Sequence, residues 1–192
     1  MFSPEGLPGE PTLAQLGSLG DGEIDATIRS FQAGFSWLRE PELVSVAAVQ
    51  GHAVGAGFQL ALACDLRVVA DDARFAMRET SLGLVPDLGG TKPLVDAVGP
   101  SRALEICATG RWVEAGEARD LGLATLVVPR QRLDASVADL VAALVEPLHG
   151  AVAGLKQLLV GAAERSYEDQ LLAERVVQAE RLRELARALR GG

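Results

Sequence analysis

The feature that most constrains the fold is a glycine-rich segment, Gly51–Gln59, that comes almost directly after a short apolar run. The run Leu43–Val49 is rich in valine, as buried strands are, and the apolar stretch Phe58–Cys64 suits a helix. Small residues at 55–57 allow a backbone to approach another group closely. The sequence therefore predicts a buried strand, a glycine turn and a helix whose first backbone N–H groups form an anion site.

Two carboxylates follow this segment, each beside turn-forming residues. Glu79 comes after Arg74–Met77, which predicts a short strand, and Asp87 precedes Gly89 and Gly90. An anion site alone transfers no proton, so carboxylates close to it would add acid–base chemistry. Each carboxylate also has a structural alternative, because Glu79 suits a solvated strand end and Asp87 suits a turn.

The rest of the chain predicts mixed α/β structure, followed by helices. Residues 3–22 are rich in proline and glycine and predict a loop, whereas apolar side chains recur at helical spacing from Ile24 to Leu38. Further strands and helices are expected at residues 66–70, 74–77, 92–98, 101–109, 114–121 and 124–128. We therefore expect a core of residues 1–131 and a helical region of residues 132–192.

The last predicted helix carries an apolar stripe. Ser166 and Asp169 have the spacing of a helix-capping box. Apolar side chains then recur every three or four residues, at Leu172, Val176, Ala179, Leu182, Ala186 and Leu189. Such a stripe must bury against another surface, which is either its own domain or a neighbouring subunit.

Charge and hydropathy disfavour several classes of partner. The net charge of −8 argues against a nucleic-acid surface, since phosphate contacts need clustered Lys or Arg. No run reaches the roughly eighteen apolar residues of a membrane span. The first residues have neither the basic nor the apolar region of a signal peptide. We expect a cytoplasmic protein without nucleic-acid or membrane partners.

The cysteines and histidines do not predict a metal site. Cys64 and Cys107 lie in apolar helical contexts without C-x-x-C spacing, so we interpret both as reduced core residues. His52 and His149 have neither triad nor metal-ligand spacing. We therefore expect no bound metal.

Six ordered segments of the chain form a specific pattern. They read G-H-A-V-G-A-G, A-L-A-C-D-L-R-V-V-A, R-F-A-M-R-E, L-G-L-V-P-D-L-G-G-T, A-T-G-R and A-x-x-L-G-L-A-x-x-V-V-P. Together they resemble the enoyl-CoA hydratase/isomerase, or crotonase, family, closely over residues 43–129 and more loosely beyond. The resemblance implies an α/β spiral of ββα units with a C-terminal helical trimerisation region. It also implies an acyl-CoA substrate with no cofactor beyond its own CoA, and a homotrimer or dimer of trimers.

The resemblance further implies an oxyanion hole made of two backbone N–H groups around the thioester oxygen. One donor of the family lies in the middle of the glycine segment, at Ala56 here. The other follows a loop that matches Phe2-Ser3-Pro4-Glu5-Gly6, which indicates Gly6. An enolate oxygen gains from such preorganised donors, although the alternative for Ala56 is merely a tight turn. We also expect substrate contacts from Gly55, Gly57 and Gln59.

The acid–base residues favour isomerisation over hydration. Hydratases of the family place one glutamate in the helix after the glycine segment and another after the R-F strand. Glu79 matches the second, but Gln59 stands at the first and cannot transfer a proton at neutral pH. Several isomerases carry an aspartate in the L-G-L-x-P/A-D segment, where Asp87 stands. We therefore expect Glu79 and Asp87 to shift a double bond in an unsaturated acyl-CoA.

Two alternatives to this function stay open. One is a hydratase that adds water to a trans-2-enoyl-CoA. The other is a catalytically inactive acyl-CoA-binding or assembly subunit. The latter is motivated by Gln59 and by the position of Phe2–Gly6 at the start of the sequence, where the family has further residues that form the early strands of the spiral. We expect those N-terminal strands to be missing.

Overall fold

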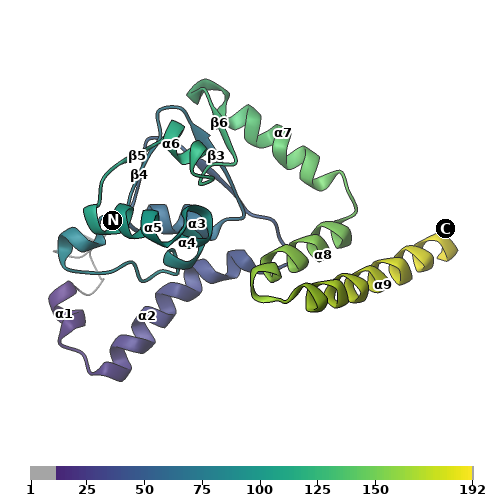
Figure 1. Cartoon of the computed structure of the whole chain (residues 1–192), viewed down its shortest axis with the longest axis horizontal. Helices are drawn as coiled ribbons and strands as arrows, with labels where there is room; N and C mark the ends of the chain where they lie inside the picture. The colour runs from purple at the N-terminus through teal and green to yellow at the C-terminus, as the bar shows by residue number, and fades with distance from the viewer. Residues whose placement is uncertain (1–11, 192) are drawn as a thin grey trace. The chain divides into compact units, whose positions relative to one another are not determined.

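The computed structural model describes residues 12–191, which form two compact units (Figure 1). The first unit runs up to Arg39 and resumes over Ser45–Val137. The second unit contains Glu40–Val44 and the chain from Ala138 onward.

Two three-stranded sheets form the frame of the first unit. The first sheet is parallel throughout and has the order β1 (Val46–Val49), β3 (Leu66–Ala70) and β6 (Leu126–Val128). The second has the order β2 (His52–Val54), β4 (Arg74–Ala76) and β5 (Val113–Glu114). In this sheet β4 is parallel to β2 and antiparallel to β5. The predicted α/β class is confirmed.

A strand of the first sheet and then a strand of the second precede α3 (Ala56–Ala63), and the same order precedes α4 (Thr91–Val98) and α5 (Pro100–Thr109). β1 and β2 lead into α3, and β3 and β4 lead to α4 and α5. The helix α6 (Ala115–Asp120) then joins β5 to β6. Short 3-10 helices occupy Trp37–Arg39, Glu79–Leu82, Arg130–Arg132 and Ala162–Glu164. The order strand, strand and helix thus occurs twice in succession, as expected for a spiral of ββα units, and β5, α6 and β6 follow it.

The core of the first unit centres on α3 and β4. The rings of Phe58 and Phe75 have no exposed surface, and their centroids lie 5.0 Å apart at an angle of 46°. Tilted aromatic pairs of this kind contribute about 0.5–1.5 kcal/mol beyond their burial. Other fully buried side chains around them are Val69, Met77, Leu94, Ile106, Val113 and Leu123. This packing holds the start of α3 firmly against the second sheet.

Two helices precede the sheets, α1 (Leu13–Gly17) and α2 (Asp21–Ser36). The loop predicted over residues 3–22 is therefore wrong where these helices lie. Thr12 and Gln15 exchange side-chain and backbone hydrogen bonds of 2.8 and 3.2 Å in a capping box, which satisfies the first turn of α1. The amphipathic helix predicted from Ile24 is confirmed, with a 3-10 turn in place of its last residues.

Two short strands, β2 and β5, were not predicted from the sequence pattern. β2 has three residues within the glycine segment, and its partner in the sheet, β4, lies about twenty residues further along the chain. Such a strand has too few residues for a periodic pattern. It forms because it pairs with β4, and Gly51, with a φ of 62°, turns the chain from β1 into it.

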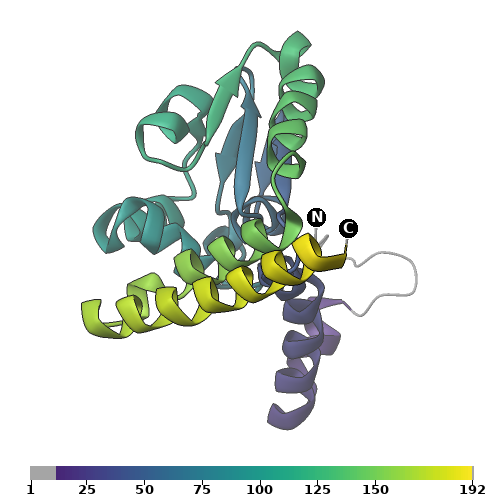
Figure 2. The same ribbon diagram turned by 90° about the vertical axis from the view of Figure 1, so that its right-hand side faces the viewer.

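The second unit is helical and includes most of α7 (Leu133–Val145), α8 (His149–Val160) and α9 (Tyr167–Gly191). The helices α8 and α9 lie side by side (Figures 1 and 2). The Nζ of Lys156 donates a hydrogen bond of 2.9 Å to the carbonyl of Leu43. Ser166 caps α9 as predicted, since its Oγ accepts a hydrogen bond of 3.1 Å from the N–H of Asp169.

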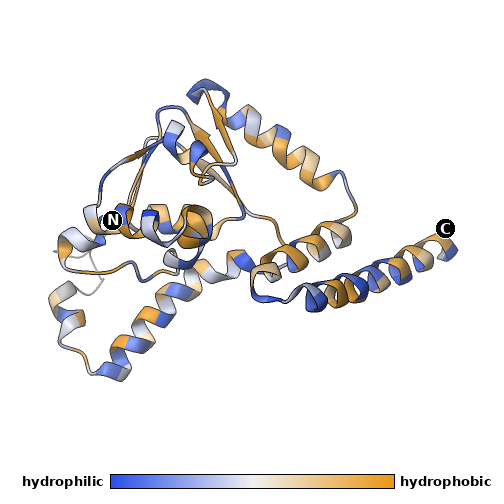
Figure 3. Cartoon of the chain, in the orientation of Figure 1, coloured by the Kyte–Doolittle hydropathy of each residue, from blue (hydrophilic) through white to orange (hydrophobic). Residues whose placement is uncertain are grey.

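The helices of the second unit differ in hydropathy. Figure 3 shows that α8 is largely hydrophobic, whereas hydrophobic and hydrophilic residues alternate along α9. Within residues 12–191 no single helix is long and apolar enough to cross a membrane. The sharply bent pair at 130–145 and 150–164 reaches that length and apolarity only when both helices are counted together.

Candidate functional site

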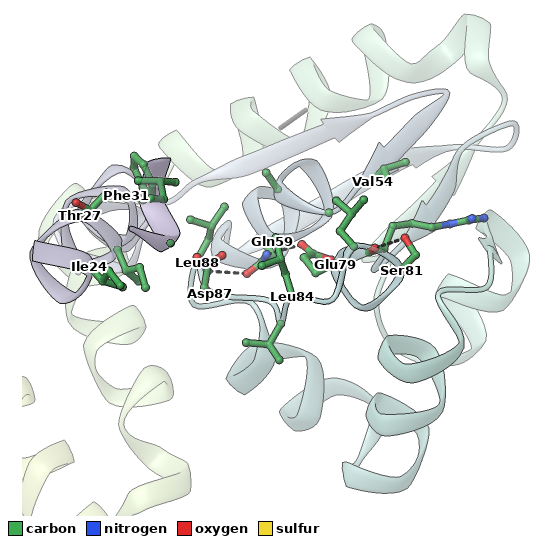
Figure 4. A pocket seen from close by; sticks show the side chains of 18 residues that line it. Ile24, Thr27, Phe31, Val54, Gln59, Glu79, Ser81, Leu84, Asp87 and Leu88 are labelled. Atoms are coloured by element: carbon green, nitrogen blue, oxygen red, sulfur yellow. Dashed lines mark hydrogen bonds between the residues drawn. The ribbon is translucent and has the colours of Figure 1, made fainter. Parts of the chain in front are cut away.

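An apolar cavity of about 580 Å³ lies in the first unit beside the start of α3 (Figure 4). Its walls are mostly aliphatic and aromatic side chains from α1, α2 and the segment after β4. They include Leu16, Ile24, Ile28, Phe31, Leu82, Leu84, Val85 and Leu88. Gln59, Glu79 and Asp87 bring polar groups to this lining. The cavity therefore offers an apolar space with carboxyl groups on its wall, which suits a hydrocarbon chain that undergoes proton transfer.

Gly55 sets the entry into α3. Its φ of 52° and ψ of −115° are rarely adopted by residues with a side chain, and an added Cβ would lie 3.1 Å from Oε1 of Glu79. The N–H of Gly55 donates a hydrogen bond of 2.9 Å to the carbonyl of Ala76, which ties the turn to β4. The backbone conformation favours glycine here, and an added Cβ would also push the Glu79 carboxylate slightly away.

The first backbone N–H groups of α3 do not donate to hydrogen bonds within the helix. The first helical bond of α3 runs from the N–H of Gln59 to the carbonyl of Gly55, at 2.9 Å. Ala56 comes before that donor and lines the cavity. The N-terminus of a helix favours negative charge, so this end of α3 is a suitable place for a developing oxyanion.

Gln59 connects the two parts of the site that carry carboxylates. Its side chain is 1% exposed, and its Nε2 donates a hydrogen bond of 2.8 Å to Oε1 of Glu79. Its Oε1 accepts hydrogen bonds from the N–H groups of Leu88 and Gly90, at 2.9 and 3.3 Å. Figure 4 shows the amide between Glu79 and the segment of Asp87 and Leu88.

Glu79 begins the 3-10 helix that follows β4. Its Oε1 accepts the hydrogen bond from Gln59, whereas its Oε2 is closed off from solvent and has no hydrogen-bond partner among residues 12–191. Leaving a buried polar atom unpaired costs free energy, and native structures contain few such atoms. An unpaired carboxylate oxygen beside an apolar cavity is therefore a candidate for contact with a ligand.

Asp87 lies half-buried on the loop between the 3-10 helix and α4. Burial raises the pKa of its carboxyl group above the ordinary value of 3.8. Its carbonyl oxygen accepts a hydrogen bond of 2.8 Å from Nε2 of Gln32, which links the loop to α2. A carboxyl group with a raised pKa keeps its proton to a higher pH, as a general acid must.

The structure brings most of the predicted site residues to one cavity. Gly55, Ala56, Gln59, Glu79 and Asp87 all line it. Gly57 lies in the first turn of α3, is exposed and is not among the lining residues. Gly6, the predicted second oxyanion donor, lies outside the described residues.

Some residues of the site were missed in the sequence analysis. The apolar stripe of α2 was predicted, but nothing in its pattern indicated that Ile24, Ile28 and Phe31 face a cavity. The backbone N–H groups that hold Gln59 were missed as well, because a main-chain donor leaves no signal in the side-chain pattern. The pair Gly89-Gly90 was the only local hint of a close approach.

The segment A-T-G-R supplies a structural ion-pair cluster and not a second site. The guanidinium of Arg111 bonds Glu105 of α5 and Glu117 of α6, with its closest contacts at 2.5 and 2.7 Å. These contacts hold the pKa of both carboxyl groups below the ordinary value of 4.5. In residues 12–191 no group of three or more His, Cys, Asp or Glu side chains is arranged to hold a metal ion.

Comparison with known proteins places these residues in a family context. The chain matches the model of the enoyl-CoA hydratase/isomerase family over residues 14–188. A Mycobacterium tuberculosis protein named as an enoyl-CoA hydratase is 34% identical over 151 residues, which are 79% of this chain and 59% of that protein. The carnitinyl-CoA dehydratase of Citrobacter koseri is 39% identical over 137 residues, or 71% and 52% of the two chains. The chain thus spans between half and three-fifths of these curated relatives.

Solved structures show the same fold. A Thermobifida fusca YX protein named as an enoyl-CoA hydratase, in complex with CoA, has a TM-score of 0.89 and 47% identity over 97% of this chain and 70% of its own. A structure named in the same way, in complex with acetoacetyl-CoA, has a TM-score of 0.89 and 47% identity over 95% and 71%. These likenesses confirm the spiral of ββα units predicted from the sequence.

Proposed function

The chain belongs to the enoyl-CoA hydratase/isomerase family, and on this basis we propose that it binds an unsaturated acyl-CoA thioester and shifts a double bond within the acyl group. The apolar cavity would hold the acyl chain, and Glu79 and Asp87 would transfer protons at its wall. The Thermobifida fusca structures that contain CoA and acetoacetyl-CoA support the choice of thioester ligands for a chain of this fold.

The observation that carries the proposal is the buried amide of Gln59. The resemblance to the family's hydratases implies that hydration uses two glutamates, and Gln59 stands where one of them is expected. An amide neither gives nor takes a proton at neutral pH. Of the two positions that carry glutamates in hydratases, only that of Glu79 has a carboxyl group here. Asp87 brings a second carboxyl group to the same cavity. Two carboxyl groups that flank an acyl chain suit proton removal at one carbon and proton return at another.

The proposed reaction balances without a redox step. One carboxylate takes a proton from a carbon of the acyl group, and the electron pair moves toward the thioester oxygen to give an enolate. The N–H of Ala56, and Gly6 as the predicted second donor, stabilise that oxygen. A proton then returns two or more carbons away, so one C–H bond breaks and one forms. No cofactor beyond the CoA of the substrate is needed for this chemistry.

The test measures the conversion of a 3-enoyl-CoA into its 2-enoyl isomer by proton NMR. We expect Glu79→Gln to lower turnover roughly 100-fold or more and Asp87→Asn to lower it clearly, since each removes a proton-transfer group. Asp139→Asn, which changes an exposed carboxylate of the second unit, serves as the matched control. Hydration of crotonyl-CoA at a rate that Asp87→Asn leaves unchanged would contradict isomerisation.

Hydration is the second candidate, and one observation favours it. Gln59 and Glu79 lie in hydrogen-bond contact at the cavity, and an amide beside a carboxylate can hold a water molecule. In that case Glu79→Gln would abolish hydration of a trans-2-enoyl-CoA, whereas 3-enoyl-CoA would not react. A protein that binds acyl-CoA with no turnover of either substrate would be the inactive subunit.

We also propose that the chain assembles as a homotrimer or a dimer of trimers through its C-terminal helices. The support is the set of exposed apolar side chains on α8 and α9, which are Leu155, Leu159, Leu172, Val176, Leu182, Leu185 and Leu189. Apolar surface of this extent is unusual on a monomer. Native mass spectrometry at micromolar concentration measures the subunit number directly, and a monomer would contradict the proposal.

A further inference from the structure

The side-chain amide of Gln59 can adopt only one orientation. Its Oε1 faces two backbone N–H donors, those of Leu88 and Gly90, and its Nε2 faces a carboxylate oxygen of Glu79. Turning the amide by half a rotation would set N–H against N–H twice and oxygen against oxygen once. The main chain therefore decides that Gln59 presents a donor to Glu79.

This fixed donor makes the two carboxylate oxygens of Glu79 different. Oε1 is occupied by the hydrogen bond of 2.8 Å from Gln59, whereas Oε2 has no partner among residues 12–191. A proton on Oε1 would compete with the donated N–H, so Oε2 is the oxygen that is open to protonation. We infer that Gln59 is a positioning residue that makes Oε2 of Glu79 the proton-transferring oxygen and holds the Asp87 loop in place. The inference rests on the proposed role of Glu79 in proton transfer.

The packing around the amide supports a positioning role. A Cβ on Gly90 would lie 2.7 Å from Cγ of Gln59, so the loop backbone presses directly on the side chain. The next residue after Asp87, Leu88, donates one of the two bonds to Oε1. One buried side chain thus connects Glu79 with the loop that carries Asp87.

Gln59→Glu tests this role because it keeps the shape and the acceptor but replaces the donor N–H by oxygen. Two carboxyl groups at hydrogen-bond distance cannot both ionise readily, so they share a proton and the pKa of the pair rises. We expect the acidic limb of the kcat/KM pH profile to move up by about one unit or more. An acidic limb that stays in place would show that the side chain at position 59 does not contact Glu79, and it would overturn the inference.

Gln59→Met provides the second arm, since it keeps the approximate volume and removes every polar contact. We expect kcat to fall roughly 10- to 100-fold through misplacement of Glu79, with KM changed less than about threefold. Circular dichroism shows whether each variant is folded. Should Gln59→Met fail to fold, the pH profile of Gln59→Glu decides the question.

A measurement independent of activity separates this inference from the proposed function. In uniformly 15N-labelled protein, the side-chain NH2 signal of Gln59 is the one that Gln59→Glu removes. We expect this signal to shift as Glu79 titrates, and we expect Glu79→Gln to abolish that shift. If the chemical shift of this NH2 signal stays constant while Glu79 titrates, the inference is overturned, whatever activity the variants have.

The activities of the variants also distinguish a failure of the positioning role from a failure of the proposed function. If Glu79→Gln abolishes isomerisation while the Gln59 variants keep the wild-type pH profile and kcat, the positioning role is wrong and the proposed function stands. If the NH2 signal follows Glu79 but Glu79→Gln retains full isomerisation, the proposed function is wrong and the role of Gln59 in proton transfer is overturned with it.

Discussion

Gly90 presses on Gln59 so closely that a single methyl group would not fit between them. The Cβ of an alanine at position 90 would lie 2.7 Å from Cγ and 3.0 Å from Cβ of Gln59. The same amide bonds the N–H of Gly90 and Oε1 of Glu79. The absence of a side chain at one loop position thus leaves room for the amide that contacts Glu79 on another segment.

Gly90→Ala should therefore displace Gln59 and lower activity. Overpacking of a tight site typically costs about 1–3 kcal/mol of stability, and we expect turnover of a 3-enoyl-CoA to fall at least roughly 10-fold. Chemical denaturation and the isomerisation assay measure the two effects. Gly116→Ala in α6, where an added Cβ meets nothing within 4 Å, is the matched control and should keep full activity. Equal behaviour of the two variants would contradict the tight contact.

Asp87→Asn should raise stability while it lowers activity. Burial raises the pKa of Asp87, so the folded state binds its proton more tightly than the unfolded state does. Stability contributed by this group is therefore lost as pH rises from the unfolded value near 3.8 through the folded value. At neutral pH the Asp87→Asn variant buries no charge at this position. The melting temperature of the variant should therefore exceed that of the wild type. The difference should shrink as the pH is lowered toward the unfolded value of 3.8, as differential scanning calorimetry at pH 7 and at pH 3.5 can test.

Arg111→Leu should remove an acid-sensitive contribution to stability. Arg111 lowers the pKa of Glu105 and Glu117, and this contribution is present above their unfolded value of 4.5. It is lost as pH falls through their folded values, because both carboxyl groups then bind protons. We expect the urea midpoint of the variant to lie below that of the wild type at pH 7, and the difference between the two midpoints to shrink as the pH falls below 4.5. Arg119→Leu, which breaks an exposed pair with the adjacent Asp120, should change little at either pH.

Phe58→Ala should destabilise the first unit by about 3–5 kcal/mol, as truncation of a fully buried aromatic side chain does. The ring packs on Phe75 and immediately precedes Gln59. Guanidinium denaturation measures the loss. Leu104→Ala, at a side chain that is 70% exposed on α5, should stay within about 0.5 kcal/mol of the wild type. A loss at Phe58 as small as that would show that the ring is not part of the core.

The strands and helices with strong local patterns could be predicted from the sequence. The run Leu66–Ala70 is a strand with the predicted bounds, and the helix predicted at residues 101–109 differs from α5 by one residue. These segments carry apolar periodicity and turn residues within a few positions of each other. β2 and β5 have three and two residues and exist only because they pair with β4, so no local pattern indicates them.

The sequence by itself determined the family, the order of those elements that have a local pattern and the residues at which chemistry is expected, since these depend on residue types at fixed spacings. Only the tertiary structure decided how those residues are partnered. Gln59 was predicted to contact substrate, a prediction still untested, yet its bonds to Glu79, Leu88 and Gly90 span 20, 29 and 31 residues. Contacts over such separations form when packed elements bring distant segments together, and spacing along the chain does not encode them.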